Sequence, residues 1–331
     1  MKENDIRPKS LMQDNAACVE ADKDYLRDRR SDWIDVVCPA CAQAAQTAFG
    51  EKDGFSYVQC DSCKTVYTSP RPDEALLKEF YAQSKNYEYW NKYIFPASNE
   101  ARKKGIYRPR AEMMVEACKG YGIRGGSFVE IGAGFGSFCE VVDSLGFFDE
   151  IIAIEPTTDL AETCRQKGFT VLNQMIETVE ETLAADVIAS YEVVEHLFNP
   201  FAFLEKCNRL LRPGGLLFLS CPNFKGFDMN TLGVLSDSFD HEHINYFHPR
   251  SLTDLLVRAG YEVKTVYTPG KLDASIVRGA LQEGKINTTG NKLVDHVLGE
   301  GWDEFGADFQ KMITDYGLSS HMMVVAQKPE A

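Results

Sequence analysis

The fold of this chain is indicated by the stretch Phe128-Val129-Glu130-Ile131-Gly132-Ala133-Gly134-Phe135-Gly136, in which an apolar strand runs into three alternating glycines. A second apolar segment ends in the carboxylate of Glu155, nineteen residues after Gly136. Glycines let the backbone turn sharply and approach a ligand closely, and a carboxylate that ends the second strand can accept hydrogen bonds from both hydroxyls of a ribose. The stretch therefore predicts a pocket for a cofactor that contains a nucleoside.

A NAD-dependent enzyme is one alternative for such a pocket. Its glycine pattern is G-x-G-x-x-G, in which the third glycine allows close helix packing beside a pyrophosphate. Here the third position is Ser137, and the pattern is instead E-x-G-x-G-x-G. The missing glycine disfavours a dinucleotide.

The E-x-G-x-G-x-G pattern resembles motif I of the class I S-adenosylmethionine-dependent methyltransferases, and the similarity extends over about residues 100–266. From residue 126 onward, strand-like and helix-like segments alternate, which predicts a parallel sheet covered on both faces. The resemblance implies a Rossmann-like α/β fold with a mostly parallel sheet and an antiparallel last strand. It also implies S-adenosylmethionine as the methyl donor.

The resemblance further implies which residues bind the donor. Ligands of open α/β sheets collect beyond the carboxyl ends of the strands, so these residues follow successive predicted strands. An apolar pair after the third strand is expected to contact the adenine, with ordinary loop packing as the alternative. The expected cofactor-binding residues are Glu130, Gly132, Ala133, Gly134, Gly136, Phe138, Glu155, Pro156, Met175, Ile176, Tyr191, Glu192 and His196. Arg108 and Arg110 either reach the carboxylate of the bound amino-acid moiety or remain solvated charges.

Catalytic groups are expected in two segments. Residues 192–197 read E-V-V-E-H-L and resemble an E-H signature of small-molecule methyltransferases. Residues 240–249 read D-H-E-H-I-N-Y-F-H-P and resemble an H-x-x-Y-F element of bacterial methyltransferases that act on sugars and secondary metabolites.

A hydroxyl becomes a competent nucleophile only as its proton is removed, and histidine suits that task. We expect His243 or His196 to be the general base, Glu192 or Glu242 to orient it, and Tyr246 to position the acceptor. The alternative is that these residues only order the loop.

A metal-assisted reaction is a second mechanism for the same residues. Glu192, Glu195 and His196, together with a later histidine, resemble the divalent-cation site of certain O-methyltransferases, in which Mg²⁺ polarises the acceptor oxygen. Activity that survives EDTA would exclude this alternative.

Two C-x-x-C knuckles precede the methyltransferase-like region. Cys38-Pro-Ala-Cys41 and Cys60-Asp-Ser-Cys63 are separated by eighteen residues, which is zinc-ribbon spacing. Four thiolates complete a closed tetrahedral shell for a structural Zn²⁺, whereas a redox C-x-x-C or a chance pattern are the alternatives. The other six cysteines are single and are expected to be reduced.

The sequence is expected to divide into four parts. An insertion before the last strand is too long for an idle loop and is expected to form a lid, a substrate wall or a dimer contact. The parts are an N-terminal extension over 1–32, a zinc ribbon over 33–70, a helical linker or lid over 71–118, and a methyltransferase domain over 119–331 with its insert at 268–319.

The composition of the chain limits the classes of molecule that it is expected to bind. The chain has 331 residues, 44% of them hydrophobic, and a net charge of −14, which disfavours nucleic acid because phosphate binding relies on clustered Lys and Arg. The first ten residues lack a signal-peptide core, and no apolar run approaches the ~20 residues of a membrane span. We therefore expect a cytoplasmic protein without membrane or nucleic-acid partners, and a homodimer is one way to use the insert.

The chain as a whole resembles zinc-ribbon-bearing methyltransferases of bacterial polysaccharide and deoxysugar pathways. This resemblance implies a small-molecule acceptor, a sugar or nucleotide-linked sugar methylated on a hydroxyl, with nitrogen and carbon as the alternative acceptor atoms. An RNA methyltransferase would have a basic ribbon, but residues 33–68 contain only two lysines and no arginine. A non-catalytic binding protein would have damaged cofactor motifs, and here motif I and Glu155 are intact.

Overall fold

The structure of the chain is a computed structural model that describes residues 3–179 and 183–330. Seven strands form the central sheet in the order β12-β13-β10-β9-β6-β7-β8. The strands β6 to β10 are parallel to one another, and β13 lies antiparallel between β10 and β12. This arrangement confirms the predicted fold class. The strands are β6 (Ser127–Ile131), β7 (Glu150–Ile154), β8 (Thr170–Leu172), β9 (Ala185–Tyr191), β10 (Leu211–Pro222), β12 (Glu262–Tyr267) and β13 (His321–Gln327).

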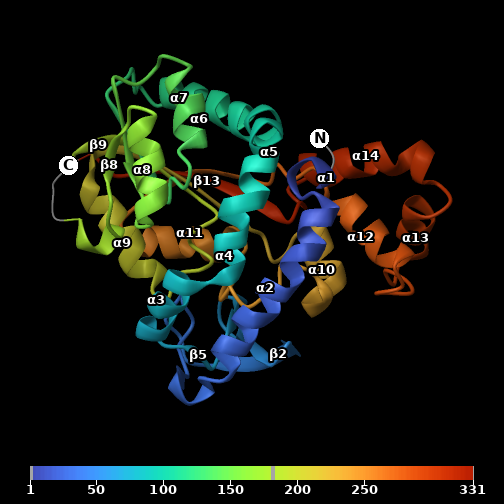
Figure 1. Cartoon of the computed structure of the whole chain (residues 1–331). Helices are drawn as coiled ribbons and strands as arrows, with labels where there is room; N and C mark the ends of the chain where they lie inside the picture. The colour runs from blue at the N-terminus through green and yellow to red at the C-terminus, as the bar shows by residue number, and fades with distance from the viewer. Residues whose placement is uncertain (1–2, 180–182, 331) are drawn as a thin grey trace.

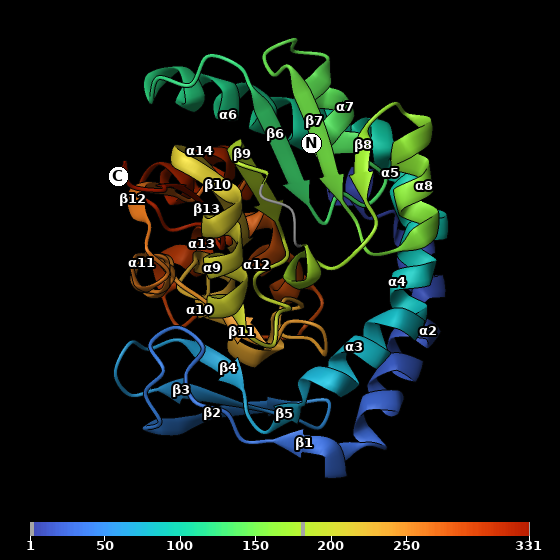
Figure 2. The same cartoon turned by 90° about the vertical axis from the view of Figure 1, so that its left-hand side faces the viewer.

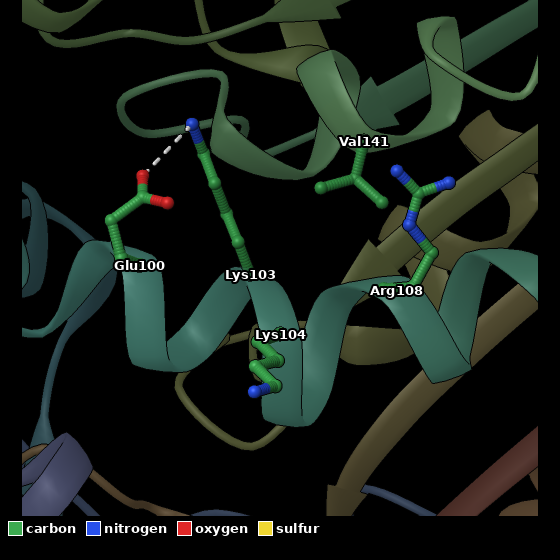
Figure 3. A pocket seen from close by; sticks show the side chains of 5 residues that line it. All are labelled: Glu100, Lys103, Lys104, Arg108 and Val141. Carbon is green, nitrogen blue, oxygen red and sulfur yellow. Dashed lines mark ion pairs between the residues drawn. The ribbon is translucent and has the colours of Figure 1, made fainter.

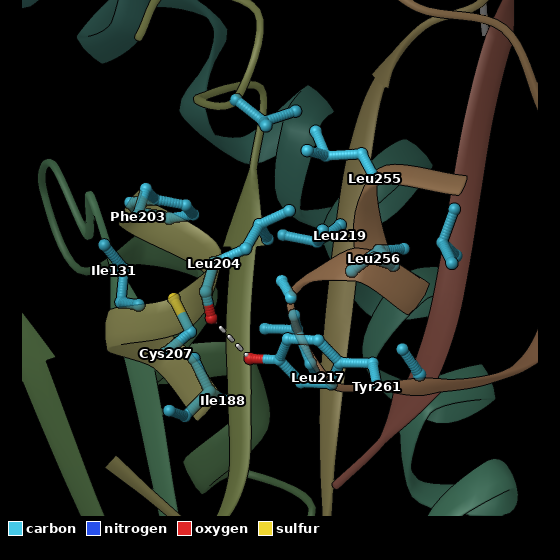
Figure 4. Packing of buried hydrophobic residues seen from close by; sticks show 14 of the residues in the cluster. Ile131, Ile188, Phe203, Leu204, Cys207, Leu217, Leu219, Leu255, Leu256 and Tyr261 are labelled. Atoms are coloured by element: carbon cyan, nitrogen blue, oxygen red, sulfur yellow. Dashed lines mark hydrogen bonds between the residues drawn. The ribbon is translucent and has the colours of Figure 1, made fainter. Parts of the chain in front are cut away.

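Two apolar cores cover the two faces of this sheet. Successive residues of a strand point to opposite faces, so Phe128 packs with one core and Val129 with the other. The first core includes α6 (Arg108–Gly120) and α7 (Ser137–Asp143), while the second includes α9 (Pro200–Leu210) and α11 (Pro249–Arg258). In the second core the Tyr261 hydroxyl donates to the Leu204 carbonyl at 3.0 Å (Figure 4). The helix α8 (Thr158–Gln166) connects β7 to β8.

The ribbon is a small antiparallel sheet below the central one (Figure 2). It contains β2 (Gln46–Lys52), β3 (Phe55–Cys60) and β4 (Val66–Thr68). Its fourth strand, β11 (Asn245–Tyr246), comes from the segment rich in histidines and pairs with β4. A second short pair joins β1 (Trp33–Ile34) to β5 (Arg71–Pro72).

The ribbon is fastened to both ends of α11. The His248 ring caps the helix by accepting from the Ser251 amide, and its Nε2 lies 2.8 Å from the carbonyl oxygen of Cys63. At the other end, the Arg258 guanidinium donates to the carbonyl of Ala40. Both knuckles therefore rest on one helix of the large domain.

A helical arm connects the ribbon to β6 and runs beside the N-terminal helix (Figures 1 and 2). The short helices α1 (Glu3–Ile6) and η1 (Arg30–Asp32) flank α2 (Lys9–Arg27), which lies against α4. The arm itself consists of α3 (Glu74–Gln83), α4 (Lys85–Tyr89), the π-helix η2 (Trp90–Ile94), α5 (Phe95–Arg102) and the π-helix η3 (Lys103–Tyr107).

The insert before β13 is helical. It consists of α12 (Asp273–Gln282), α13 (Lys292–Leu298) and α14 (Trp302–Asp315), which share an apolar cluster with α10 (Phe227–Leu232). Its use as a lid, substrate wall or dimer contact stays a prediction. The remaining short elements are the 3₁₀ turns η4 (Ile176–Thr178) and η5 (Gly233–Leu235). Among the helices in the described ranges, none combines the length and the apolar character needed to cross a membrane.

Candidate active site

The glycine loop leaves the carboxyl end of β6 in a backbone conformation that favours glycine. Gly132, Gly134 and Gly136 all have positive φ, at 75°, 53° and 66°. A Cβ added to Gly136 would lie 3.0 Å from the sulfur of Cys164, so this position also lacks space for a side chain. Gly132 is exposed, which leaves this part of the loop open to a ligand.

Glu155 holds the ends of β6 and β7 together. Its two carboxylate oxygens accept from the backbone amides of Gly134 and Thr157, each at 2.8 Å. Burial raises the pKa of this carboxyl group, against the opposing effect of these amides. Pro156 is exposed beside it, and the Asn173 side chain donates to the carbonyls of Glu155 and Pro156, both at 2.9 Å. Asn173 was not predicted as a site residue.

Three other predicted cofactor-binding residues are buried in or next to the glycine loop. Glu130, Ala133 and Phe138 are buried. The Cys139 thiol donates to Glu130 at 2.9 Å, and burial raises the pKa of Glu130 to about 8. The ring of Phe138 meets that of Tyr191 edge-on, with 5.0 Å between centroids. Their direct contact with the cofactor stays a prediction.

The two residues that were predicted to contact the adenine differ in exposure. Met175 is 41% exposed, whereas Ile176 is 4% exposed and belongs to the core that contains α9 and α11. Only Met175 therefore offers a free side-chain surface after β8.

A charged cluster follows β9. Glu192 has a φ of 57°, a strained value for a residue with a side chain, and it accepts from the Ser220 hydroxyl. The Arg110 guanidinium lies 4.3 Å from the centroid of the Tyr191 ring and 3.9 Å from the Glu192 carboxylate. His321 Nδ1 lies 3.6 Å from the same carboxylate.

Sequence reasoning missed His321 as part of this cluster. It begins β13, and an antiparallel strand places its first residue beside the last residues of its parallel neighbours. The antiparallel last strand could therefore have indicated this position. Of the two arginines left open, Arg110 faces the cluster, while Arg108 donates to Ser144, the residue that follows α7.

The predicted base candidates lie side by side. The ring centroids of His196 and His243 are 4.7 Å apart. Nδ1 of His196 is 3.1 Å from the carbonyl oxygen of Glu242, which can only accept, so Nδ1 carries the hydrogen and Nε2 has the lone pair. Tyr81, which was not predicted, places its hydroxyl 3.3 Å from the same Nδ1.

The two imidazoles differ in charge. Burial and the neighbouring His243 lower the pKa of His196 to about 3, so its ring is neutral. Burial also acts to lower the pKa of His243, but the carboxylates of Asp240 and Glu195 outweigh it and raise that pKa to about 9. A neutral ring with a free lone pair therefore lies next to a protonated one.

Glu242 contacts His196 through its backbone carbonyl, because its carboxylate instead accepts from the Asn86 side chain at 2.6 Å; its role in orienting the base stays a prediction. Tyr246 is 1% exposed, and its ring stacks on Phe239 with centroids 4.2 Å apart. This burial in the ribbon does not support contact between Tyr246 and an acceptor, which stays a prediction.

Glu195 fits magnesium poorly. Glu195 is 1% exposed, and one ligand atom each from Glu195, His196 and His243 lies within 4.8 Å of the other two. Neither carboxylate oxygen of Glu195 has a hydrogen-bond partner among the described residues. Burial and the charge of Glu192 raise the pKa of Glu195 to about 8. Mg²⁺ prefers an octahedron of oxygen ligands, whereas two of these three groups are imidazoles.

The four predicted zinc ligands come together. The sulfurs of Cys38, Cys41, Cys60 and Cys63 all lie within 4.8 Å of one another, with 3.4 Å between Cys38 and Cys63 and 3.5 Å between Cys41 and Cys60. A tetrahedron of thiolates with Zn–S bonds of 2.3 Å has edges of roughly 3.8 Å. The cluster therefore fits a four-coordinate zinc ion with no position left for a substrate.

A separate shallow pocket lies between the helical arm and α7. Figure 3 shows it between η3 and α7, lined by Glu100, Lys103, Lys104, Arg108 and Val141. Lys103 forms ion pairs with Glu100 and with Glu140. The pocket includes Arg108, but none of the expected cofactor-binding, catalytic or zinc-binding residues lines it.

Residues 103–266 match a family described as "Methyltransferase domain". This region of the chain is a methyltransferase domain. The match confirms the predicted resemblance, and its bounds are close to the similarity read from the sequence. The glycine loop, Glu155 and both histidine segments all lie within this domain.

Known methyltransferases are similar in sequence to part of the chain. The chain is 31% identical over 114 residues to a "Ubiquinone biosynthesis O-methyltransferase" of Bradyrhizobium sp., covering 32% of this chain and 44% of that protein. A protein with the same description from Cereibacter sphaeroides is 31% identical over 150 residues, covering 40% of this chain and 59% of its own length. The match thus spans less than two thirds of either relative.

A solved S-adenosylmethionine-dependent methyltransferase from Clostridium acetobutylicum superposes with a TM-score of 0.48 at 10% identity, covering 72% of this chain and 99% of that one.

Proposed function

We propose that the chain transfers a methyl group from S-adenosylmethionine to a hydroxyl of a small molecule. The arrangement that carries the proposal is the glycine loop after β6, pinned to Glu155 after β7, with His196 after β9 and His243 after β10 at the same edge of the sheet. Ligands of open α/β sheets bind at this edge. The O-methyltransferase descriptions of the relatives support oxygen as the acceptor atom.

Four of the residues proposed to hold the donor keep exposed surface after four neighbouring strands. They are Gly132 after β6, Pro156 after β7, Met175 after β8 and Glu192 after β9. Glu155 would hold the ribose, and Arg110 is the cation available for a carboxylate. When bound, the donor supplies a methyl group on a positively charged sulfur.

His196 is the proposed general base. As the acceptor oxygen forms its bond to the methyl carbon, the carbon–sulfur bond breaks with its electrons going to sulfur, and the hydroxyl proton passes to Nε2 of His196. The hydrogen bond from Nδ1 to the Glu242 carbonyl fixes the ring in the tautomer that this step needs. His243, one ring away, would stabilise negative charge on the acceptor.

A sugar or nucleotide-linked sugar is the acceptor that the sequence resemblance favours, and an intermediate of ubiquinone biosynthesis, which can be tested as a phenol, is the alternative suggested by the names of the relatives. The four-cysteine ribbon is proposed to hold a structural Zn²⁺.

Donor binding tests the proposal first. Glu155→Gln should weaken S-adenosylmethionine binding by about 10- to 100-fold, because a hydrogen bond to a charged group contributes roughly 1.5–3 kcal/mol. Isothermal titration calorimetry measures this, with the exposed Glu177→Gln in η4 as the matched control. Absence of donor binding by the wild-type chain would refute the function.

Methyl transfer tests the base. His196→Gln should lower the rate of S-adenosylhomocysteine formation by about 10²- to 10⁴-fold, as expected for loss of general-base catalysis. The rate is measured on the acceptors found in a screen of nucleotide-linked sugars and phenols. A variant whose donor affinity falls as much as its rate would instead identify His196 as a donor-binding residue.

A further inference from the structure

A second cluster of metal-binding side chains lies outside the ribbon and outside the proposed catalytic pair. Asp22 of α2 approaches His241 and Glu242 of the loop before β11, and one ligand atom from each of the three lies within 4.8 Å of the others. The cluster joins the N-terminal helix to the segment that contains His243.

His241 is the unexplained member of this group. Its side chain is 2% exposed, yet neither ring nitrogen has a hydrogen-bond partner among the described residues. One side of the ring faces Phe80 edge-on, with 5.8 Å between centroids, and Nε2 points toward the Glu242 carboxylate at 3.7 Å. A buried polar group without a partner costs free energy, so a ligand for this nitrogen is to be expected.

The two carboxylates retain the capacity to bind an ion. Asp22 accepts from the Ser84 hydroxyl and from the amides of Lys85 and Asn86, which uses three of its roughly four acceptor positions. Glu242 accepts from the Asn86 side chain through Oε1, which leaves Oε2. Within residues 3–179 and 183–330, neither carboxylate forms an ion pair with a lysine or an arginine, and the partner of Glu242 is the imidazole of His241.

We propose that Asp22, His241 and Glu242 bind a divalent transition-metal ion of the Zn²⁺ type. One imidazole nitrogen and two carboxylate oxygens are ligands that Zn²⁺ accepts, and three protein ligands leave the fourth position to water. The ion would satisfy the buried nitrogen and neutralise the two carboxylates. It would fasten α2 to the loop one residue before His243, which gives the N-terminal helix a role in holding the active site.

Metal content tests this site independently of methyl transfer and of the ribbon. Purified full-length wild type, His241→Ala and Glu242→Gln are brought to equilibrium by dialysis against buffered Zn²⁺, and zinc per chain is measured by mass spectrometry. Glu242→Gln keeps an oxygen for the bond from Asn86, so it serves if His241→Ala folds poorly by circular dichroism. His296→Ala, an exposed histidine on α13, is the matched control.

The wild type and His296→Ala should each hold one equivalent of zinc more than His241→Ala and Glu242→Gln. All four chains retain the ribbon cysteines, so ribbon zinc cancels in the comparison. Equal zinc in all four would overturn the proposal and leave His241 as a histidine paired only with Glu242.

Discussion

At the residue scale, Glu130 makes stability depend on pH. Burial raises its pKa to about 8 from the ordinary value of 4.5. The folded chain therefore keeps this proton up to pH about 8, whereas the unfolded chain releases it near pH 4.5, so stability falls as pH rises through this window. Glu130→Gln has no proton to lose. Its free energy of unfolding relative to wild type should rise by on the order of a few kcal/mol across the window.

Urea unfolding at several pH values measures this difference. The buried Gln keeps an oxygen for the thiol of Cys139, so the comparison isolates the charge. A difference that stays constant with pH would show that Glu130 is ionised in the folded chain.

At the scale of elements, His248 joins the ribbon to α11. Its ring caps the helix and meets the carbonyl of Cys63, so His248→Ala should lower the free energy of unfolding by about 1–3 kcal/mol, from a lost cap and a lost hydrogen bond. Urea denaturation measures the loss, with the exposed His296→Ala expected to change little. Equal losses in both variants would contradict the coupling.

Most strands of the central sheet could be predicted because they are apolar runs between turn residues, and their order follows the methyltransferase resemblance. The helix α2 could not, since the residues it buries include the polar Asn15 and Asp22, which produce no apolar periodicity. In the insert, the sequence itself indicates one helix, near 291–298, and the structure has α13 there; α12 and α14 are not indicated by the sequence. The strand β11 has two residues, and its partner β4 lies far earlier in the chain.

The candidate site also contains some features that could be predicted from the sequence and others that could not. Groups that follow strands directly, such as Gly132, Glu155 and His196, could be predicted from their positions in the sequence. The different charges of His196 and His243 could not, because they depend on burial and on the distances to Asp240 and Glu195. Only the folded chain sets those distances.

At the scale of the whole molecule, the ribbon and the histidine-rich segment over residues 240–249 share one sheet through the pairing of β11 with β4. Because β11 pairs with β4, loss of the zinc ion proposed for the ribbon should loosen residues 244–247, even though no cysteine of the ribbon is a proposed catalytic group. Treatment with a strong zinc chelator should raise amide hydrogen exchange in these residues at least several-fold, together with exchange in β4. The amides of β6 serve as the internal reference. Unchanged exchange in residues 244–247 after zinc release would show that the loop is held without the ribbon.

The place of β13 in the sheet also has a consequence for biosynthesis. A ribosome releases β10 and β12 first, and the strand that separates them emerges only with residues 321–327. Until then the nascent chain carries two unsatisfied strand edges facing a gap, which is the kind of surface that chaperones shield and that aggregates if left open. Translation that stops within the helical insert would therefore yield a product that contains every proposed catalytic group but cannot close its sheet.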